Sequence, residues 1–296
     1  MAQENQNKTL LDAIGHRFTT TTITYNEQDA ALYALSIGAS EDPLDNSDLQ
    51  FTYELAPSGF HCFPTFAVTF PLQTMEQIGS IPDQRLNLME VLHGEHYLEL
   101  FRPLPAAAAI TSQAEISQVY DKGSGALILV DITSTDQDGQ RVAFNQASLF
   151  VRGRGNFGGS RGPSTRPNNL PERPSDEAVR EKTADNQALL YRLTSGDRNP
   201  LHADTRFAAL LGYPRPILHG LCTYGYAARA LLKTFGANDP QLFKSIKARF
   251  SSHIFPGETI ETEMWQESAT NILFRSRVIE RDEVVLSNGV FTLQPQ

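Results

Sequence analysis

The segment from His219 to Lys233 constrains the fold more than any other part of this 296-residue chain. It is predicted to form one helix with apolar or small side chains on nearly every face. A helix without a polar face has to be enclosed by other elements, so we expect a helix wrapped by a sheet. Its apolar character comes from Leu221, Tyr224, Ala227, Ala228, Leu231 and Leu232.

Runs rich in β-branched and alternating apolar residues predict strands in both halves of the chain. The Gly-rich connection 121–125 is typical of a hairpin between two of them. Apolar and polar residues alternate in 115–120, which favours an antiparallel sheet with one wet face. The expected strands are 19–25, 95–101, 107–120, 126–131 and 142–151, followed by 188–193, 245–250, 259–266, 272–279 and 284–293.

Two further helices are predicted from their start and stop signals. One covers 26–37 and ends at Gly38, and the other covers 200–211 and ends at Gly212. The aromatic stretch 51–70 is interrupted by prolines, so we expect strand fragments and a loop that is exposed or lines a pocket. A short helix broken by Gly79 and Pro82 is expected within 72–89.

The two halves resemble each other in the order of their elements, which indicates duplication of a whole domain. In this comparison 26–38 corresponds to 199–212, and 101–105 corresponds to 253–257. The Gly-, Pro- and Arg-rich stretch 152–185 has few apolar residues and is typical of a connector. We therefore expect an α+β chain with an N-terminal domain (1–151), a linker (152–185) and a C-terminal domain (186–296).

Composition narrows the possible partners of the chain. The formal net charge of −9 argues against general nucleic-acid binding, which needs a basic surface. No apolar run approaches the roughly 20 residues needed to cross a membrane. Cys62 and Cys222 form neither a disulfide framework nor a zinc spacing, so we expect a reducing compartment and no bound metal. The N-terminus lacks the features of a secretory signal, and the C-terminus is no recognisable peroxisomal tripeptide.

The stretch 191–202, Tyr-Arg-Leu-Thr-Ser-Gly-Asp-Arg-Asn-Pro-Leu-His, holds the strongest chemical signal. Asn199 is a good helix N-cap and Pro200 suits the first helical position. Asp197 then lies in the loop just before the helix and His202 lies in its first turn. A carboxylate and an imidazole on either side of one helix start can share a water molecule, and histidine can both accept and donate a proton near neutrality.

A second signal is Leu218-His219-Gly220-Leu221, at the start of the enclosed helix. A glycine there exposes backbone N–H groups at the positive end of the helix dipole, which suits an oxyanion such as a thioester enolate. Two interpretations of Gly220 stay open, because the same glycine could serve close packing of the helix. His219 is interpreted as structural.

Other patterns are weaker. Gly153–Gly158 matches the dinucleotide fingerprint, but no helix pattern follows it, so a nucleotide-binding site of that kind is rejected. His93 and Gly94 are weak signals when taken alone. Lys122, in a Gly-rich hairpin, would by default face solvent.

Taken together, these motifs resemble the hydratase 2 family, a group of MaoC-like dehydratases that includes the hydratase 2 region of peroxisomal multifunctional enzyme type 2. The resemblance is carried by 191–202 and by 212–221, Gly-Tyr-Pro-Arg-Pro-Ile-Leu-His-Gly-Leu. It extends into the first half through 91–100, 121–125 and 157–159. The family fold is the double hot dog, with two long central helices that are each wrapped by an antiparallel sheet.

The resemblance also implies an activity, the reversible hydration of trans-2-enoyl-CoA to (3R)-3-hydroxyacyl-CoA in fatty-acid β-oxidation. Asp197 and His202 would hold and activate the water with help from Asn199, leaving open which of the two is the base. The N–H of Gly220 would hold the thioester oxygen. The first domain, which has no Asp/His pair, would receive the fatty tail.

By the same resemblance, His93, Gly94, Lys122 and Phe250 would contact the acyl-CoA, and Lys247 and Arg249 could meet its phosphates. No cofactor is implied, and a homodimer and a peroxisomal location are expected from the family alone. Whether the chain stands alone or is a piece of a larger enzyme stays open. The alternative functions are a hot-dog acyl-CoA thioesterase and a non-catalytic acyl-CoA binding module.

Overall fold

The computed structural model describes residues 10–295 apart from 43, 82–83, 85 and 164–169. Within these residues ten strands form one antiparallel sheet, in the order β1-β3-β4-β5-β2-β7-β10-β9-β8-β6. The predicted strands of both halves are therefore present, apart from 188–193 and the strand fragments expected within 51–70, which are described below. The first five are β1 (Thr21–Tyr25), β2 (Val91–Leu100), β3 (Ala108–Asp121), β4 (Gly125–Thr135) and β5 (Arg141–Arg152). The others are β6 (Glu177–Lys182), β7 (Phe243–Phe250), β8 (Thr259–Gln266), β9 (Asn271–Val278) and β10 (Glu283–Leu293).

The strand order shows that the chain contains a repeat. Read from either end it gives the same pattern, with β1–β5 replaced by β6–β10, and the two copies meet at β2 and β7. Helix α1 (Glu27–Ser36) follows β1, and helix α4 (Gln187–Ser195) follows β6. The predicted match of 26–38 with 199–212 was therefore wrong, since α1 corresponds to α4. The loops 101–105 and 253–257 both follow central strands, as predicted.

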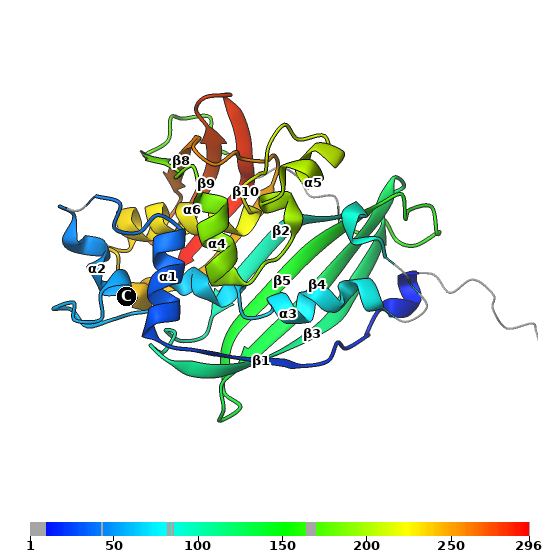
Figure 1. Cartoon of the computed structure of the whole chain (residues 1–296), viewed down its shortest axis with the longest axis horizontal. Coiled ribbons are helices and arrows are strands. Elements are labelled where there is room, and N and C mark those ends of the chain that lie inside the picture. The colour runs from blue at the N-terminus through cyan, green and yellow to red at the C-terminus, as the bar shows by residue number, and fades with distance from the viewer. Residues whose placement is uncertain (1–9, 43, 82–83, 85, 164–169, 296) are drawn as a thin grey trace, which may run out of the picture.

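The enclosed helix is α6 (Gly220–Phe235), as the sequence predicts. Every residue from Leu221 to Leu232 is buried, and the helix packs against the strands of the second half. Its one buried cation, Arg229, pairs with Asp48 of the first half at 3.0 Å and with Glu181 of β6 at 2.7 Å. Figure 1 shows α1 and α4 next to each other in front of α6.

The first half has no long central helix among its described residues, which differs from the predicted pair of long helices. The expected strand fragments of 51–70 are absent too. Prolines at 57, 64 and 71 interrupt the backbone hydrogen bonding that a long helix needs. Only short pieces form, and α3 lies across β3, β4 and β5 in Figure 1. These pieces are α2 (Leu49–Thr52), a 3₁₀ helix (Pro64–Val68), α3 (Leu72–Met75) and a 3₁₀ helix (Glu76–Ser80).

Two predictions in the second half were wrong in detail. The expected strand 188–193 is part of α4, because Ala188, Tyr191 and Ser195 recur at a helical spacing and form its buried face. The expected helix 200–211 consists of a 3₁₀ turn (Pro200–His202) and helix α5 (Thr205–Leu210). The side chain of Asp204 caps a new helix start there by accepting from Arg206 N–H.

The predicted linker contains a strand of the sheet. Strand β6 pairs with β8 along the edge of the second half. The loop around Gly153–Gly158 forms no helix, and Asp121 holds it by accepting from the backbone N–H groups of Gly123, Asn156 and Gly158. Residues 164–169 of the predicted linker and Pro82 of the predicted 72–89 segment lie outside the described residues.

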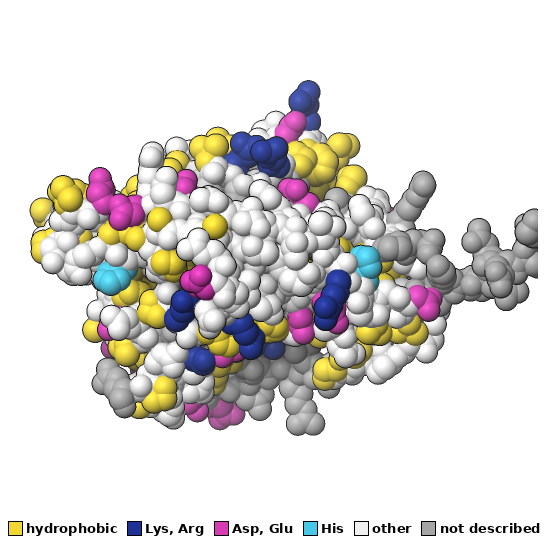
Figure 2. Space-filling view, turned by 90° about the horizontal axis from the view of Figure 1, so that it is seen from below, with side chains coloured by type: hydrophobic (Ala, Val, Ile, Leu, Met, Phe, Trp, Pro, Cys, Tyr) yellow, Lys and Arg dark blue, Asp and Glu magenta, His cyan; other side chains and the backbone are white. Residues whose placement is uncertain are grey.

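The molecular surface has a mixed charge pattern. On the face shown in Figure 2, Lys and Arg side chains lie in small separate groups among acidic and neutral ones. Such mixing is typical of a solvated surface. Among the helices described, none combines the length and the apolar character that a bilayer crossing requires.

Candidate active site

The site begins where α4 ends. Gly196 adopts a left-handed conformation (φ 78°) that turns the chain out of the helix, a step that favours glycine. Asp197 follows directly, and its Oδ1 accepts a hydrogen bond from Asn199 N–H at 2.9 Å. Its own N–H donates to Ser195 Oγ at 3.2 Å. These bonds fix the loop and aim the carboxylate at the neighbouring 3₁₀ turn.

His202 ends that 3₁₀ turn, which Asn199 caps by accepting from Leu201 N–H at 3.1 Å. Nδ1 of His202 lies 2.9 Å from the carbonyl oxygen of Ile217. A carbonyl can only accept, so Nδ1 carries the proton in the neutral ring and Nε2 keeps a free lone pair. Burial lowers the pKa of His202, and the nearby Asp197 carboxylate partly opposes that effect. His202 is therefore a neutral base at neutral pH.

His219 joins the predicted pair, although the sequence indicated a structural role for it. Its ring stacks on that of His202 with centroids 3.7 Å apart and planes at 24°. Nε2 of His219 lies 3.9 Å from Oδ2 of Asp197. One potential ligand atom from each of the three residues lies within 4.8 Å of the other two. Lone pairs in two nearly parallel rings point along the ring planes, so they are poorly placed to converge on one metal ion.

Gly220 is the first residue of α6, and it lines the same pocket as the Asp/His pair. Its N–H has no acceptor four residues earlier within the helix, because the helix begins there. A Cβ atom at this position would lie 2.9 Å from the ring of Phe250. Both interpretations of Gly220 from the sequence therefore have a structural basis, since its N–H has no acceptor among the described residues and its Cα is tightly packed.

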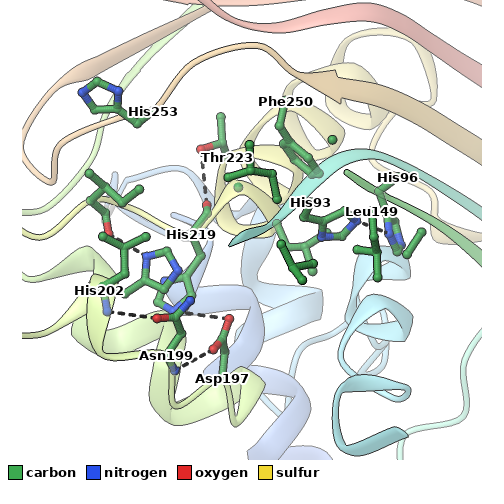
Figure 3. Close-up of a pocket in the computed structure, with 18 of the residues that line it drawn as sticks. His93, His96, Leu149, Asp197, Asn199, His202, His219, Thr223, Phe250 and His253 are labelled. Carbon is green, nitrogen blue, oxygen red and sulfur yellow. Dashed lines mark hydrogen bonds and ion pairs between the residues drawn. The ribbon is translucent and has the colours of Figure 1, made fainter. Parts of the chain in front are cut away.

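The opposite wall of the pocket comes from β2, where the register shift between His93 and Glu95 leaves Gly94 in a bulge. His93 Nε2 lies 3.2 Å from His96 Nδ1, and His96 Nε2 lies 2.9 Å from Asn145 Oδ1. Burial lowers the pKa of His93 to about 3 and that of His96 to about 4, so both rings are neutral. Figure 3 shows this pair across the pocket from the group around Asp197.

Three of the residues predicted to contact substrate do not line this pocket. The ammonium of Lys122 donates to the carbonyl oxygens of Arg161 and Pro163. Lys247 pairs with Glu95 at 2.8 Å. Successive residues of a strand face opposite sides of the sheet, so Lys247 and Arg249 point away from the side that Phe250 occupies. The structure brings His93, Gly94 and Phe250 to the pocket but not these three cations.

The pocket has a volume of about 700 Å³ and runs between the two halves. One end holds the Asp/His group, and the other end extends over the first-half sheet beneath the short helices. A continuous helix in the first half would occupy that space, so its interruption opens the apolar end. The sequence could not locate this end, because its residues come from segments that are far apart in the chain. They include Val68, Leu72, Met75, Ile78, Ile132, Ala147 and Leu149.

Comparison with known proteins identifies the family. Residues 23–153 match the model for an MFE-2 hydratase 2 N-terminal domain, and residues 167–288 match a MaoC like domain. The probable enoyl-CoA hydratase 2 of Dictyostelium discoideum is 41% identical over 95% of each chain. Mouse peroxisomal multifunctional enzyme type 2 is 42% identical over 96% of this chain, which spans only 38% of that protein's length.

Solved structures agree with this assignment. A MaoC-like dehydratase from Phytophthora capsici superposes with a TM-score of 0.87 at 37% identity, covering 97% of this chain and 98% of that one. A Mycobacterium tuberculosis protein with a double hotdog fold gives 0.61 at 14% identity, covering 95% and 96% of the two chains, which supports the fold alone. The predicted α+β double hot dog is thus confirmed, and the chain belongs to the enoyl-CoA hydratase 2 family of MaoC-like proteins.

Proposed function

We propose that this protein is a hydro-lyase that adds water reversibly to trans-2-enoyl-CoA thioesters and yields (3R)-3-hydroxyacyl-CoA in fatty-acid β-oxidation. The observation that carries the proposal is the convergence of Asp197, His202 and the start of α6 at Gly220 on one pocket. The Dictyostelium relative, matched over nearly its whole length, is named a probable enoyl-CoA hydratase 2.

The geometry supports His202 as the base in the hydration direction. Its Nε2 lone pair takes one proton from a water molecule held between His202 and Asp197. The water oxygen bonds to C3 of the substrate, and the C2–C3 double-bond electrons move toward the thioester oxygen. The imidazolium then returns its proton to C2, so one water is added and the enzyme is regenerated. The amide of Asn199, which lines the pocket, helps to orient the water.

The negative charge that develops on the thioester oxygen is stabilised at the start of α6. The N–H of Gly220 donates to this oxygen, and the positive end of the helix dipole adds to the effect. Since α6 is buried along most of its length, the donor is held rigidly. Rigid donors that are already in place are a major source of catalysis, because they need no reorganisation during the reaction.

The apolar end of the pocket receives the acyl tail. Leu72, Met75 and Leu149 line this end beside the first-half sheet. His93 and Phe250 pack edge to face with centroids 5.0 Å apart, and they flank the passage between the tail and the reacting carbons. The N-terminal half thus serves binding and the C-terminal half serves chemistry.

Peroxisomal localisation is proposed from the relatives, because the mouse protein is named a peroxisomal enzyme. A homodimer is proposed from the family resemblance alone. The double hot dog already contains within one chain the pairing of two halves through β2 and β7. Size-exclusion chromatography with light scattering would measure the number of chains in the assembly.

A substrate assay tests the proposed function against its alternatives. The protein is incubated with trans-2-decenoyl-CoA and, separately, with saturated decanoyl-CoA. Loss of the enoyl absorbance without release of free thiol supports a hydratase. Thiol release from both compounds would instead identify a thioesterase, and tight binding with no conversion of either would identify a binding module.

A further inference from the structure

His219 is a buried histidine whose ring nitrogens have no hydrogen-bond partner among the groups that the structure describes. Its side chain is 2% exposed, and it lines the pocket beside Asp197. Leaving buried polar atoms unpaired costs about 1–3 kcal/mol for each group. A purely structural ring at this position would be better served by an apolar side chain, so the two nitrogens point to a use within the site.

The geometry suggests one specific use. The Oδ1 atom of Asp197 is held by Asn199 N–H, whereas Oδ2 faces Nε2 of His219 at 3.9 Å. This separation is longer than a hydrogen bond. However, catalytic hydrogen bonds are often long in the absence of substrate and shorten in the complex. A small rotation of the partly exposed Asp197 side chain would bring the two atoms together.

We propose that His219 is a positioning residue, which donates its Nε2–H to Oδ2 of Asp197 and fixes the carboxylate plane against His202. The inference rests on the proposed hydration reaction. It adds His219 as a residue that acts through Asp197 and does not touch the substrate. With both oxygens held, Asp197 presents a defined lone pair to the water. Asp197 also stabilises the imidazolium that forms when His202 accepts a proton.

The surroundings of His219 keep it in the donor role. Burial lowers its pKa well below the ordinary value, and the nearby His202 and Arg192 lower the pKa further. A second positive charge on a ring stacked 3.7 Å from His202 would oppose protonation of the base. His219 therefore stays neutral while His202 changes charge. A neutral imidazole with Nε2 protonated is a hydrogen-bond donor to Asp197 and not a second acid.

Two substitutions test the hydrogen-bond donor and the aromatic ring of His219 independently. His219→Gln keeps an N–H at the same number of bonds from the backbone as Nε2, but it removes the ring. His219→Phe keeps the ring and its stacking on His202, but it removes the donor. We expect kcat of the Gln variant to stay within about threefold of the wild type. We expect kcat of the Phe variant to fall about 10- to 100-fold with little change in KM, since a hydrogen bond to a charged group is lost.

The pH profile is a second measurement, and it would not change if His219 served packing alone. The carboxylate of Asp197 raises the pKa of His202. In His219→Phe the Asp197 carboxylate is no longer held, so it should raise the pKa of His202 less. The acid limb of kcat/KM should therefore move to lower pH. The Gln variant should keep the wild-type limb. His219→Met, which is apolar and flexible, replaces the Phe variant if that protein does not fold, and calorimetry with decanoyl-CoA checks that the pocket still binds.

The inference is overturned if the Phe or Met variant keeps wild-type kcat, or if the Gln variant loses as much activity as the Phe variant. The second result would mean that ring stacking is what matters. An inactive wild-type protein would contradict the proposed function instead, so the two failures can be told apart.

Discussion

The Nδ1 atom of His202 donates to the carbonyl oxygen of Ile217 at 2.9 Å, and this contact decides which nitrogen can act on water. The carbonyl belongs to the segment just before α6, so the same segment that leads into Gly220 also fixes the tautomer of the base. The base and the backbone donor are thereby tied to neighbouring residues of one connection.

The pH dependence of hydration should reflect this base. Burial lowers the pKa of His202, so its neutral form persists below the ordinary histidine value of about 6.5. We expect kcat/KM to be constant near neutrality and to fall only as pH drops through that lowered pKa. Initial rates with trans-2-decenoyl-CoA across the acid range measure this. An acid limb above pH 6.5 would contradict the assignment.

Gly220→Ala tests the start of α6. The added methyl group would lie 2.9 Å from the Phe250 ring, so one of the two must move. We expect kcat/KM to fall about 10- to 100-fold, because a displacement of about 1 Å at a reacting group has effects of that size. In the double variant with Phe250→Leu, which makes room for the methyl group, part of the activity should return. Wild-type activity in Gly220→Ala alone would show that this contact does not position the site.

The folded protein should become less stable as pH falls, because His96 is buried and only 2% exposed. Its pKa is lowered to about 4 in the folded protein, so the unfolded chain binds the proton first as pH falls below about 6.5. The stability is therefore complete above pH 6.5 and is lost progressively toward pH 4. At pH 5 the loss is about 2 kcal/mol for this group.

His96→Gln removes this titration and can retain a hydrogen bond to Asn145. Urea unfolding at pH 7 and pH 5 should therefore show a smaller decrease for the variant than for the wild type. Equal decreases in both proteins would mean that His96 is not held neutral by burial.

The ion pairs of Arg229 should matter more to stability than any surface pair. Arg229→Met would leave Asp48 and Glu181 without their partner, and removing one member of a buried pair costs about 3–5 kcal/mol. Lys233→Met on the same helix is the matched control, because its pair with Asp45 is partly exposed and should be worth less than about 1 kcal/mol. Equal losses in urea unfolding would contradict a special role for Arg229.

The sequence predicted the parts of the structure that local signals determine. The stop signal at Gly38 and the apolar character of Leu221–Leu232 predicted α1 and α6, and strand alternation predicted nearly every strand. Local signals failed at α4, where an apolar run fits a strand or a helix and only packing decides between them. They also failed in the first half, where the family pattern suggested a long helix and prolines prevented it.

The residues of the site were predictable only where short motifs contain them. Asp197, His202, Asn199 and Gly220 lie in short motifs that the family resemblance assigns to one site, and all four line the same pocket. The partnership of His219 with Asp197 depends on how α4 and α6 pack, and the apolar end of the pocket depends on contacts between distant segments. Lys247 and Arg249 were predicted to meet phosphates because they are cations beside Phe250 in the sequence, and strand alternation directs them to the opposite side of the sheet.

The most direct test of the account is the configuration and amount of product formed from trans-2-decenoyl-CoA by the wild type, by Asp197→Asn and by His202→Gln. Chiral chromatography of the 3-hydroxyacyl product gives both quantities in one experiment. We predict (3R)-3-hydroxydecanoyl-CoA from the wild type, and product formation that is about 100- to 10,000-fold slower in each variant. Formation of the (3S) product, or undiminished turnover in either variant, would contradict the assignment of Asp197 and His202 as the groups that activate water.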